Sequence, residues 1–224
     1  MPTVNAENNY VSRAEGKLAG AVRAFSYDFR NKIVLDIGSS TGGFTELALK
    51  LGAKKVVAVE KGTNQMKTPL RFDSRIELHE KTDFFSVVKD QAVLSPGLSN
   101  LSSQVSSPNS RQQPPKCVKM ALSLTFDTVL ADVSFVSLKK ILWHAKQFAD
   151  FDTDFLVMLK PQFEASSRQL WKGIVKNEKI RREIIKDFEM WLKMNKFLIL
   201  KKHDNEVVGK NGNQERFYWL KLAK

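Results

Sequence analysis

Short apolar runs alternate with amphipathic segments along most of this chain. Runs of consecutive apolar residues predict strands that are buried on both faces, because neither side of such a strand can tolerate water. Segments whose apolar residues recur every three or four positions predict helices with one buried side. The expected strands are 32–37, 55–60, 75–81, 126–133, 154–160, 197–201 and 216–222, and the expected helices are 10–25, 44–51, 138–148 and 178–193.

The order of these elements predicts an α/β fold. Strands that alternate with helices form a parallel, doubly wound sheet, since each parallel connection has to cross back over the sheet. The last two strands differ, because only a polar turn at 207–213 separates them and no helix fits there. The last strand should therefore pair antiparallel. A mostly parallel sheet with one antiparallel strand near the C-terminus is typical of the Rossmann-like class I methyltransferases.

Residues 90–124 interrupt the alternation of strands and helices. Seven serines lie between 95 and 110, and four of the chain's seven prolines lie between 90 and 124. Such a composition buries little apolar surface, and surface loops tolerate insertions well. We therefore expect a single domain over residues 1–224 with a disordered, Ser/Pro-rich insertion at 90–124. A docking or phosphorylation segment is the alternative interpretation.

The 224 residues carry a formal net charge of +12, distributed unevenly. Residues 168–224 hold 15 Lys and Arg against 7 Asp and Glu, which leaves +8 in the last quarter. This favours a polyanionic partner, with nucleic acid ahead of a membrane, over a merely soluble basic surface. The sequence has neither an apolar run of about 18 residues nor a secretory h-region. A single cysteine, Cys117, fits a reducing cytoplasm.

A glycine-rich loop, GSSTGG, joins the strand at 32–37 to the helix at 44–51. Ligands bind at this edge of an open α/β sheet. A Walker A loop needs a lysine before the Ser or Thr at its end, and Phe44 stands there instead. A dinucleotide loop needs a central glycine, and Ser40 occupies that place. Neither phosphate-binding motif therefore fits.

S-adenosyl-L-methionine carries no phosphate and fits the loop better. Its methionyl part needs small residues where it crosses the chain, and its ribose needs an acid such as Glu60 at the end of the second strand. Thr82 and Asp83, after the third strand, can recognise the adenine amine. Glycines in such a loop often serve only to form a tight turn. The assignment of the cofactor therefore rests on the order and spacing of all these residues together. The expected cofactor-binding residues are Asp36, Gly38, Ser39, Ser40, Thr41, Gly42, Gly43, Phe44, Thr45, Glu60, Thr82, Asp83 and Asp132.

Six stretches of the chain resemble the FtsJ-like RNA 2′-O-methyltransferases, and in particular their TlyA group. The resemblance begins near residue 10 and continues to the C-terminus, broken only by the Ser/Pro-rich segment. Members usually carry an S4-like RNA-binding domain before the first stretch, where this sequence has nine residues. The resemblance implies 2′-O-methylation of ribosomal RNA, free or in a ribosomal particle. The stretches are YVSRAEGKLAGAV, VLDIGSSTGGFTELALKLGAKKVVAVEKGTNQM, ADVSFVSLKKIL, MLKPQFE, KGIVKN and GNQERFYWL.

The same resemblance implies a catalytic tetrad of Lys17, Asp132, Lys160 and Glu215. A ribose 2′-hydroxyl is a very weak acid, so it needs a positioned base. Like charges disfavour the protonated form of a lysine, so Lys160 beside Lys17 would take this proton. Asp132 and Glu215 would orient the two lysines. Taken singly, Lys17 could instead be a solvated helix residue, and Glu215 a cross-strand ion-pair partner.

Other methyl acceptors fit the sequence less well. Enzymes that methylate base amines hold the nitrogen with an Asn/Asp-Pro-Pro-aromatic motif, whereas this chain has DVSF at 132–135. Methylation of cytosine C5 needs a cysteine nucleophile, and Cys117 lies in the Ser/Pro-rich segment. The three histidines are scattered, so we expect no metal site. A small-molecule O-methyltransferase and a non-catalytic RNA-binding or hemolysin-like protein remain alternatives.

Overall fold

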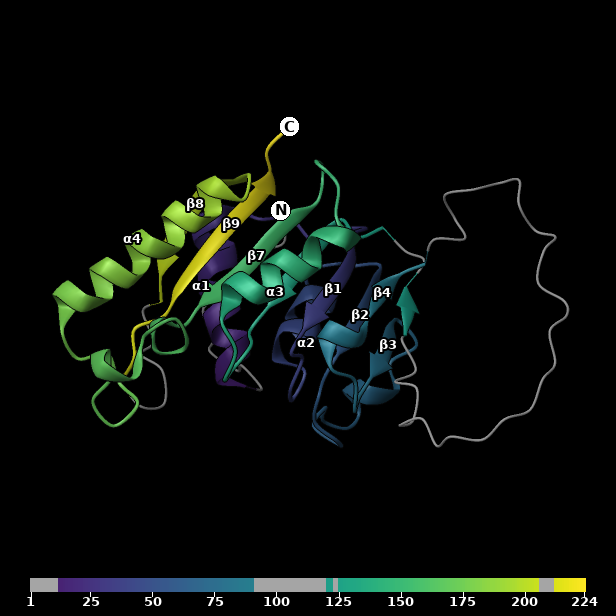
Figure 1. Cartoon of the computed structure of the whole chain (residues 1–224). Coiled ribbons are helices and arrows are strands. Elements are labelled where there is room, and N and C mark those ends of the chain that lie inside the picture. The colour runs from purple at the N-terminus through teal and green to yellow at the C-terminus, as the bar shows by residue number, and fades with distance from the viewer. Residues whose placement is uncertain (1–11, 91–119, 123–124, 206–211) are drawn as a thin grey trace, which may run out of the picture.

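A seven-stranded sheet forms the middle layer of the protein (Figure 1). The computed structural model describes residues 12–90, 120–122, 125–205 and 212–224. Along the sheet the strand order is β3-β2-β1-β6-β7-β9-β8. The strands are β1 (Ile33–Ile37), β2 (Lys55–Val59), β3 (Ile76–His79), β6 (Thr128–Ala131), β7 (Asp154–Leu159), β8 (Phe197–Asp204) and β9 (Arg216–Leu222).

Every neighbouring pair from β3 to β7 is parallel, whereas β9 is antiparallel to both of its neighbours. The predicted α/β sheet with an antiparallel last strand is therefore confirmed. The strand β9 inserts between β7 and β8, a position that the sequence did not predict. The chain order reverses between β1 and β6, which makes their carboxyl ends the switch point where ligands bind in open α/β sheets.

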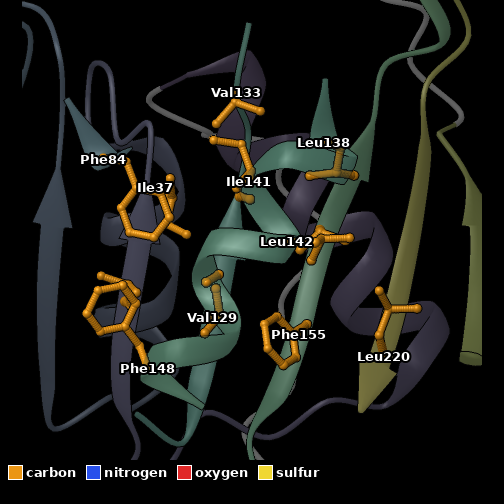
Figure 2. Close-up of a cluster of buried hydrophobic side chains, with 14 of the residues drawn as sticks. Ile37, Phe84, Val129, Val133, Leu138, Ile141, Leu142, Phe148, Phe155 and Leu220 are labelled. Atoms are coloured by element: carbon orange, nitrogen blue, oxygen red, sulfur yellow. The ribbon is translucent and has the colours of Figure 1, made fainter. Parts of the chain in front are cut away.

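Helices cover both faces of the sheet (Figure 1). The helices α1 (Arg13–Phe25) and α2 (Gly43–Lys50) share one core, and α3 (Leu138–Ala145) and α4 (Glu178–Met194) share the other. Alternate side chains of β7 enter the two cores, since successive residues of a strand point to opposite faces. Figure 2 shows Leu142 of α3 near Phe155 of β7, within the α3/α4 core.

Several predicted boundaries shift in the structure. Helix α1 begins at Arg13, because the Ser12 Oγ accepts the Glu15 N–H at 3.1 Å and caps it. Residues 10 and 11, expected in this helix, lie outside the described residues. The strand β8 continues past residue 201 to Asp204, because β9 offers it a partner as far as Arg216. No helix among the described residues is long and apolar enough to cross a membrane.

The flanks of the expected insertion meet in a small second sheet. The strand β4 (Val88–Lys89) pairs parallel with β5 (Ala121–Leu122), and Leu122 is buried in the α3/α4 core. The insertion expected at 90–124 therefore includes β5, which is part of the folded domain, because the apolar end of that segment can pack against the sheet. The remainder of that segment, 91–119 and 123–124, lies outside the described residues, as does Cys117.

Candidate active site

The four residues of the predicted tetrad lie on elements that converge at one edge of the sheet. Asp132 follows β6 and Lys160 follows β7, so both stand at the carboxyl ends of neighbouring parallel strands. Glu215 directly precedes the antiparallel β9. The pairing of Leu159 with Arg216 makes Lys160 and Glu215 the next opposed positions along the two strands.

The tetrad forms two ion pairs, each between one lysine and one carboxylate. The Lys17 Nζ lies 2.5 Å from the Glu215 Oε2, and the Lys160 Nζ lies 2.6 Å from the Asp132 Oδ1. The second contact is an ion pair by distance but is poorly aligned as a hydrogen bond. Lys160 also donates to the Ser134 Oγ at 3.0 Å. The structure thus gives each lysine a carboxylate as a charged partner.

Glu215 is held from several sides at the start of β9. Besides the Lys17 contact, its Oε2 accepts from the Asn205 Nδ2 at 3.4 Å, and its backbone carbonyl accepts the Asn205 N–H at 3.0 Å. Asn205 and Glu215 are both buried. Sequence reasoning missed Asn205, because an asparagine beside a polar turn usually serves the turn.

The glycines of the loop make room mainly for other parts of the protein. A Cβ on Gly43 would lie 2.3 Å from the Ser12 Oγ, and a Cβ on Gly42, whose φ is +93°, would lie 2.4 Å from a Leu70 methyl group. The start of α1 can therefore rest directly on the start of α2, and this packing helps to place Lys17 at the edge. Gly38, with φ of +78°, instead faces the backbone that follows β6.

Buried oxygen atoms without hydrogen-bond partners surround the same loop. Among the described residues, neither the Asp36 Oδ1, the Ser39 Oγ nor the Asp132 Oδ1 has such a partner. The other oxygen of Asp36 accepts the Thr45 hydroxyl at 2.6 Å. Burial raises the pKa of Asp36 to about 7, against the opposing effect of the Thr45 hydrogen bond and with a contribution from the Asp132 charge. In the described part of the chain the Asp36 and Ser39 oxygens, unlike that of Asp132, have no ion-pair partner either, and they fit a ligand that brings donors, such as the ammonium group of S-adenosylmethionine.

Glu60 ties the glycine loop to the segment that follows β2. Its Oε2 accepts the Ser40 N–H at 2.9 Å and its Oε1 accepts the Gly62 N–H at 2.6 Å. An ionised carboxylate has about four acceptor positions, so both oxygens can accept further hydrogen bonds from ribose hydroxyls. The backbone carbonyl of Thr41 accepts the Lys67 N–H at 3.3 Å, which ties the loop to this segment a second time.

The side chains predicted to reach the adenine have contacts within the protein. Asp83 accepts the Phe85 N–H at 3.0 Å and pairs with the exposed Lys61 at 2.9 Å. The Thr82 hydroxyl donates to the Glu80 carbonyl at 3.1 Å. The Phe44 ring is buried in the α1/α2 core, so only the backbone of this residue can face the loop.

An exposed aromatic side chain follows Ser134, the residue that accepts a hydrogen bond from Lys160. Phe135 is 93 % exposed and has φ of +63°, a region that bulky residues rarely adopt. Its ring centroid lies 5.3 Å from that of Phe163. Glu164 stabilises this region, since its carboxylate accepts the Ser137 hydroxyl and the Leu138 N–H at the start of α3. In the sequence, Phe135 appeared only as the last residue of the DVSF stretch, which lacks the two prolines of the base-amine motif.

No group of three or more His, Cys, Asp or Glu side chains in the described part of the chain is arranged to hold a metal ion.

The fold is that of a class I, Rossmann-like methyltransferase. It is defined by the order of the strands, by the antiparallel β9 and by a switch point at the edge of the sheet where ligands bind. The chain superimposes on a Lactococcus lactis protein provisionally named a hemolysin, with a TM-score of 0.77, 29 % identity and coverage of 96 % and 89 % of the two chains. A Burkholderia thailandensis N-methyltransferase that was solved with S-adenosylhomocysteine shares the fold, with a TM-score of 0.56 and 14 % identity over 95 % and 79 % of the chains.

The family model described as FtsJ-like methyltransferase matches residues 10–222, and the chain therefore belongs to this family. It is 30 % identical to the 16S/23S rRNA (cytidine-2′-O)-methyltransferase TlyA of Mycobacterium tuberculosis, over 97 % of this chain and 70 % of the relative. It is 29 % identical to the 23S rRNA (cytidine-2′-O)-methyltransferase TlyA of Campylobacter jejuni, over 94 % and 70 %. The resemblance stated from the sequence is confirmed.

Proposed function

We propose that this protein transfers the methyl group of S-adenosylmethionine to the 2′-hydroxyl of a ribose in ribosomal RNA, in the cytoplasm. The observation that carries the proposal is the pair of lysine–carboxylate contacts at the switch-point edge. An O-methyltransferase needs a base for the hydroxyl proton there. The names of the two TlyA relatives support ribosomal RNA as the methyl acceptor.

In this proposal Lys160 accepts the proton of the 2′-hydroxyl. Asp132 and Ser134 hold the amino group of Lys160, so that its lone pair has a fixed direction after one ammonium proton has passed to bulk water and before the hydroxyl proton is accepted. Lys17 and Glu215 fix the opposite side of the acceptor site. The bound cofactor supplies an electrophilic methyl group. Because the oxygen, the methyl carbon and the sulfur have to be in line, positioning by these four residues supplies much of the rate.

The cofactor would lie between the glycine loop and the end of β2. Glu60 would accept the ribose hydroxyls, and the unpaired Asp36 Oδ1 would face the methionyl ammonium group. Asp83 would meet the adenine amine after releasing Lys61, an exchange that is easy because this ion pair is largely exposed. Ser39 would offer its hydroxyl oxygen, which has no hydrogen-bond partner among the described residues, whereas Gly38, Ser40 and Thr41 would shape the loop, since several of their backbone groups already bond within the protein.

The test is transfer of a radiolabelled methyl group to RNA isolated from ribosomal particles, with small phenols as competing acceptors. After alkaline hydrolysis, a ribose 2′-O-methyl group is found in a dinucleotide that resists cleavage, because the methylated oxygen cannot attack the phosphate. A base methyl group is found in a mononucleotide. We expect label in the resistant fraction, and none with the Lys160→Ala variant. Label only in phenols would favour the small-molecule alternative. Label in mononucleotides would overturn the ribose assignment.

A further inference from the structure

Residues 171–176 form a tight hairpin between Lys160 and α4. The Trp171 N–H donates to the Ile174 carbonyl at 2.9 Å, and the Ile174 N–H donates back to the Trp171 carbonyl at 3.0 Å. The two residues at the tip, Lys172 and Gly173, have φ of +49° and +79°, as in a type I′ turn. Because lysine rarely adopts this conformation, neighbouring contacts have to hold the turn in place.

Asn213 supplies those contacts and ties the hairpin to the active site. Its buried side chain accepts the Val175 N–H at 3.0 Å and donates to the Gly173 carbonyl at 3.2 Å. Asn213 is two residues before Glu215, which places their backbones within about 7 Å of each other in an extended chain. Figure 1 shows the start of β9 beside the loops at the N-terminal end of α4. The hairpin is therefore anchored to the segment that leads directly into Glu215 of the tetrad.

The hairpin presents an exposed indole between two ammonium groups. Trp171 is 52 % exposed, and the Nζ atoms of Lys176 and Lys172 lie 3.3 and 4.9 Å from its ring centroid. These two charges repel each other, and neither has a carboxylate partner among the described residues. The sequence has no acidic residue between Glu164 and Glu178. The surface thus combines an exposed aromatic ring with uncompensated positive charge.

We infer that this hairpin binds an unpaired nucleotide of the substrate RNA next to the ribose that is methylated, an inference that rests on the proposed function. The base stacks on Trp171, and the phosphates on its two sides contact Lys172 and Lys176. An exposed cation–π contact is weak compared with a stacked base and a phosphate contact. When RNA binds, the two ammonium groups therefore leave the Trp171 ring and contact phosphates, and the base takes their place on the ring. A paired base is excluded, because its faces are covered within a helix.

The test measures binding of a fluorescently labelled, unstructured single-stranded RNA to the full chain, with a blunt RNA duplex for comparison. We expect Trp171→Ala to weaken single-strand binding about tenfold or more, as loss of one stacked base does. Trp171→Phe keeps a ring and should retain most of the affinity. The double variant K172A/K176A should lower the slope of log affinity against log salt by about 1.4, since each phosphate contact in a single strand contributes about 0.7.

Two matched controls lie on α3. Trp143 is also exposed and has the Lys146 Nζ 5.2 Å from its ring centroid, and Lys139 and Lys140 are neighbouring cations. Neither Trp143→Ala nor K139A/K140A should change binding. Equal losses in these controls, unchanged binding by the Trp171→Ala variant, or a preference of the wild-type protein for duplex would overturn the inference.

Methyl transfer to ribosomal RNA separates this inference from the proposed function. The hairpin variants should raise KM for RNA and leave kcat at saturating RNA unchanged. Normal methyl transfer with an unchanged KM would reject the hairpin and keep the function. Loss of single-strand binding in the hairpin variants, together with no methyl transfer to RNA by the wild-type protein, would keep the hairpin and reject the function.

Discussion

The Lys17 Nζ lies 2.5 Å from the Glu215 Oε2, although 198 residues separate the two in the chain. The side chain of Lys17 is 13 % exposed and that of Glu215 is 5 % exposed, so this is a largely buried ion pair. A buried charge that loses its partner is far more costly than an exposed one. The pair therefore links the first helix to the last strand as well as completing the predicted tetrad.

Removing the carboxylate of this pair should lower the stability of the folded protein. We expect Glu215→Gln to cost about 3 kcal/mol of unfolding free energy, because it leaves the Lys17 ammonium group buried without a counter-charge. Urea unfolding measures this loss. Asp28→Asn removes the carboxylate that pairs with the exposed Arg30 and serves as a control, with a much smaller expected loss because water already solvates both charges. Equal losses in both variants would contradict the buried-pair account.

Lys160 is the residue whose loss should stop the reaction without unfolding the protein. Lys160→Ala removes the proposed base, so we expect the rate of methyl transfer to fall at least about 10²-fold. Lys160→Arg keeps a positive charge but does not release a proton near neutral pH. A base role predicts that both variants are equally inactive in single-turnover methylation with unchanged cofactor affinity. Partial activity of the arginine variant would indicate an electrostatic role instead.

Glu60 should control cofactor affinity. Glu60→Ala removes the expected acceptor for the ribose hydroxyls and also frees the Ser40 and Gly62 N–H groups. We expect S-adenosylmethionine to bind about 5- to 150-fold more weakly, as for a loss of about 1–3 kcal/mol. Titration calorimetry measures the change. Glu60→Gln keeps one acceptor oxygen and should lose less. Unchanged affinity in the alanine variant would reject this cofactor site.

Asp36 should make stability depend on pH between about 4 and 7. Its carboxyl group has a pKa of about 7 in the folded protein, raised by burial from a usual value of 3.8. As the pH rises through this window the unfolded chain releases the proton and the folded protein keeps it. Unfolding therefore becomes easier as the pH rises to about 7, with no further effect of this group above that.

Urea unfolding at a series of pH values tests the contribution of Asp36. Asp36→Asn should lose this part of the pH dependence, because the amide does not titrate. Asp28→Asn is the control: the Arg30 hydrogen bonds lower the pKa of the exposed Asp28 to about 2, so it stays ionised throughout the window. An unchanged slope in the Asp36→Asn variant would show that this carboxyl group does not titrate there.

Deleting residues 94–113 should leave folding and methyl transfer nearly unchanged. The pairing of β4 with β5 joins the chain on either side of the deleted residues, so a shorter connection can still close. Thermal unfolding and methyl transfer to ribosomal RNA check the two expectations. Loss of RNA binding by a folded deletion variant would show that this segment recognises RNA, against the interpretation of a simple insertion.

The class of fold could be predicted from the sequence alone. Buried parallel strands have to be apolar on both faces, and the apolar runs at β1, β2, β6 and β7 show this directly. The short polar connection before β9 excluded a crossover helix and so fixed the antiparallel direction. The predicted tetrad rested on motif resemblance and on strand ends, because residues at the carboxyl ends of adjacent parallel strands share one edge.

The contacts among these residues, in contrast, depend on the three-dimensional arrangement of the strands. The pairing of Lys17 with Glu215 needs β9 to insert between β7 and β8, and no local pattern encodes which neighbours a strand will take. Asn205 and Asn213 hold Glu215 and the hairpin through side-chain hydrogen bonds from polar turns, where asparagine is common for local reasons. Such long-range contacts depend on how two cores pack on one sheet, a property of the whole chain.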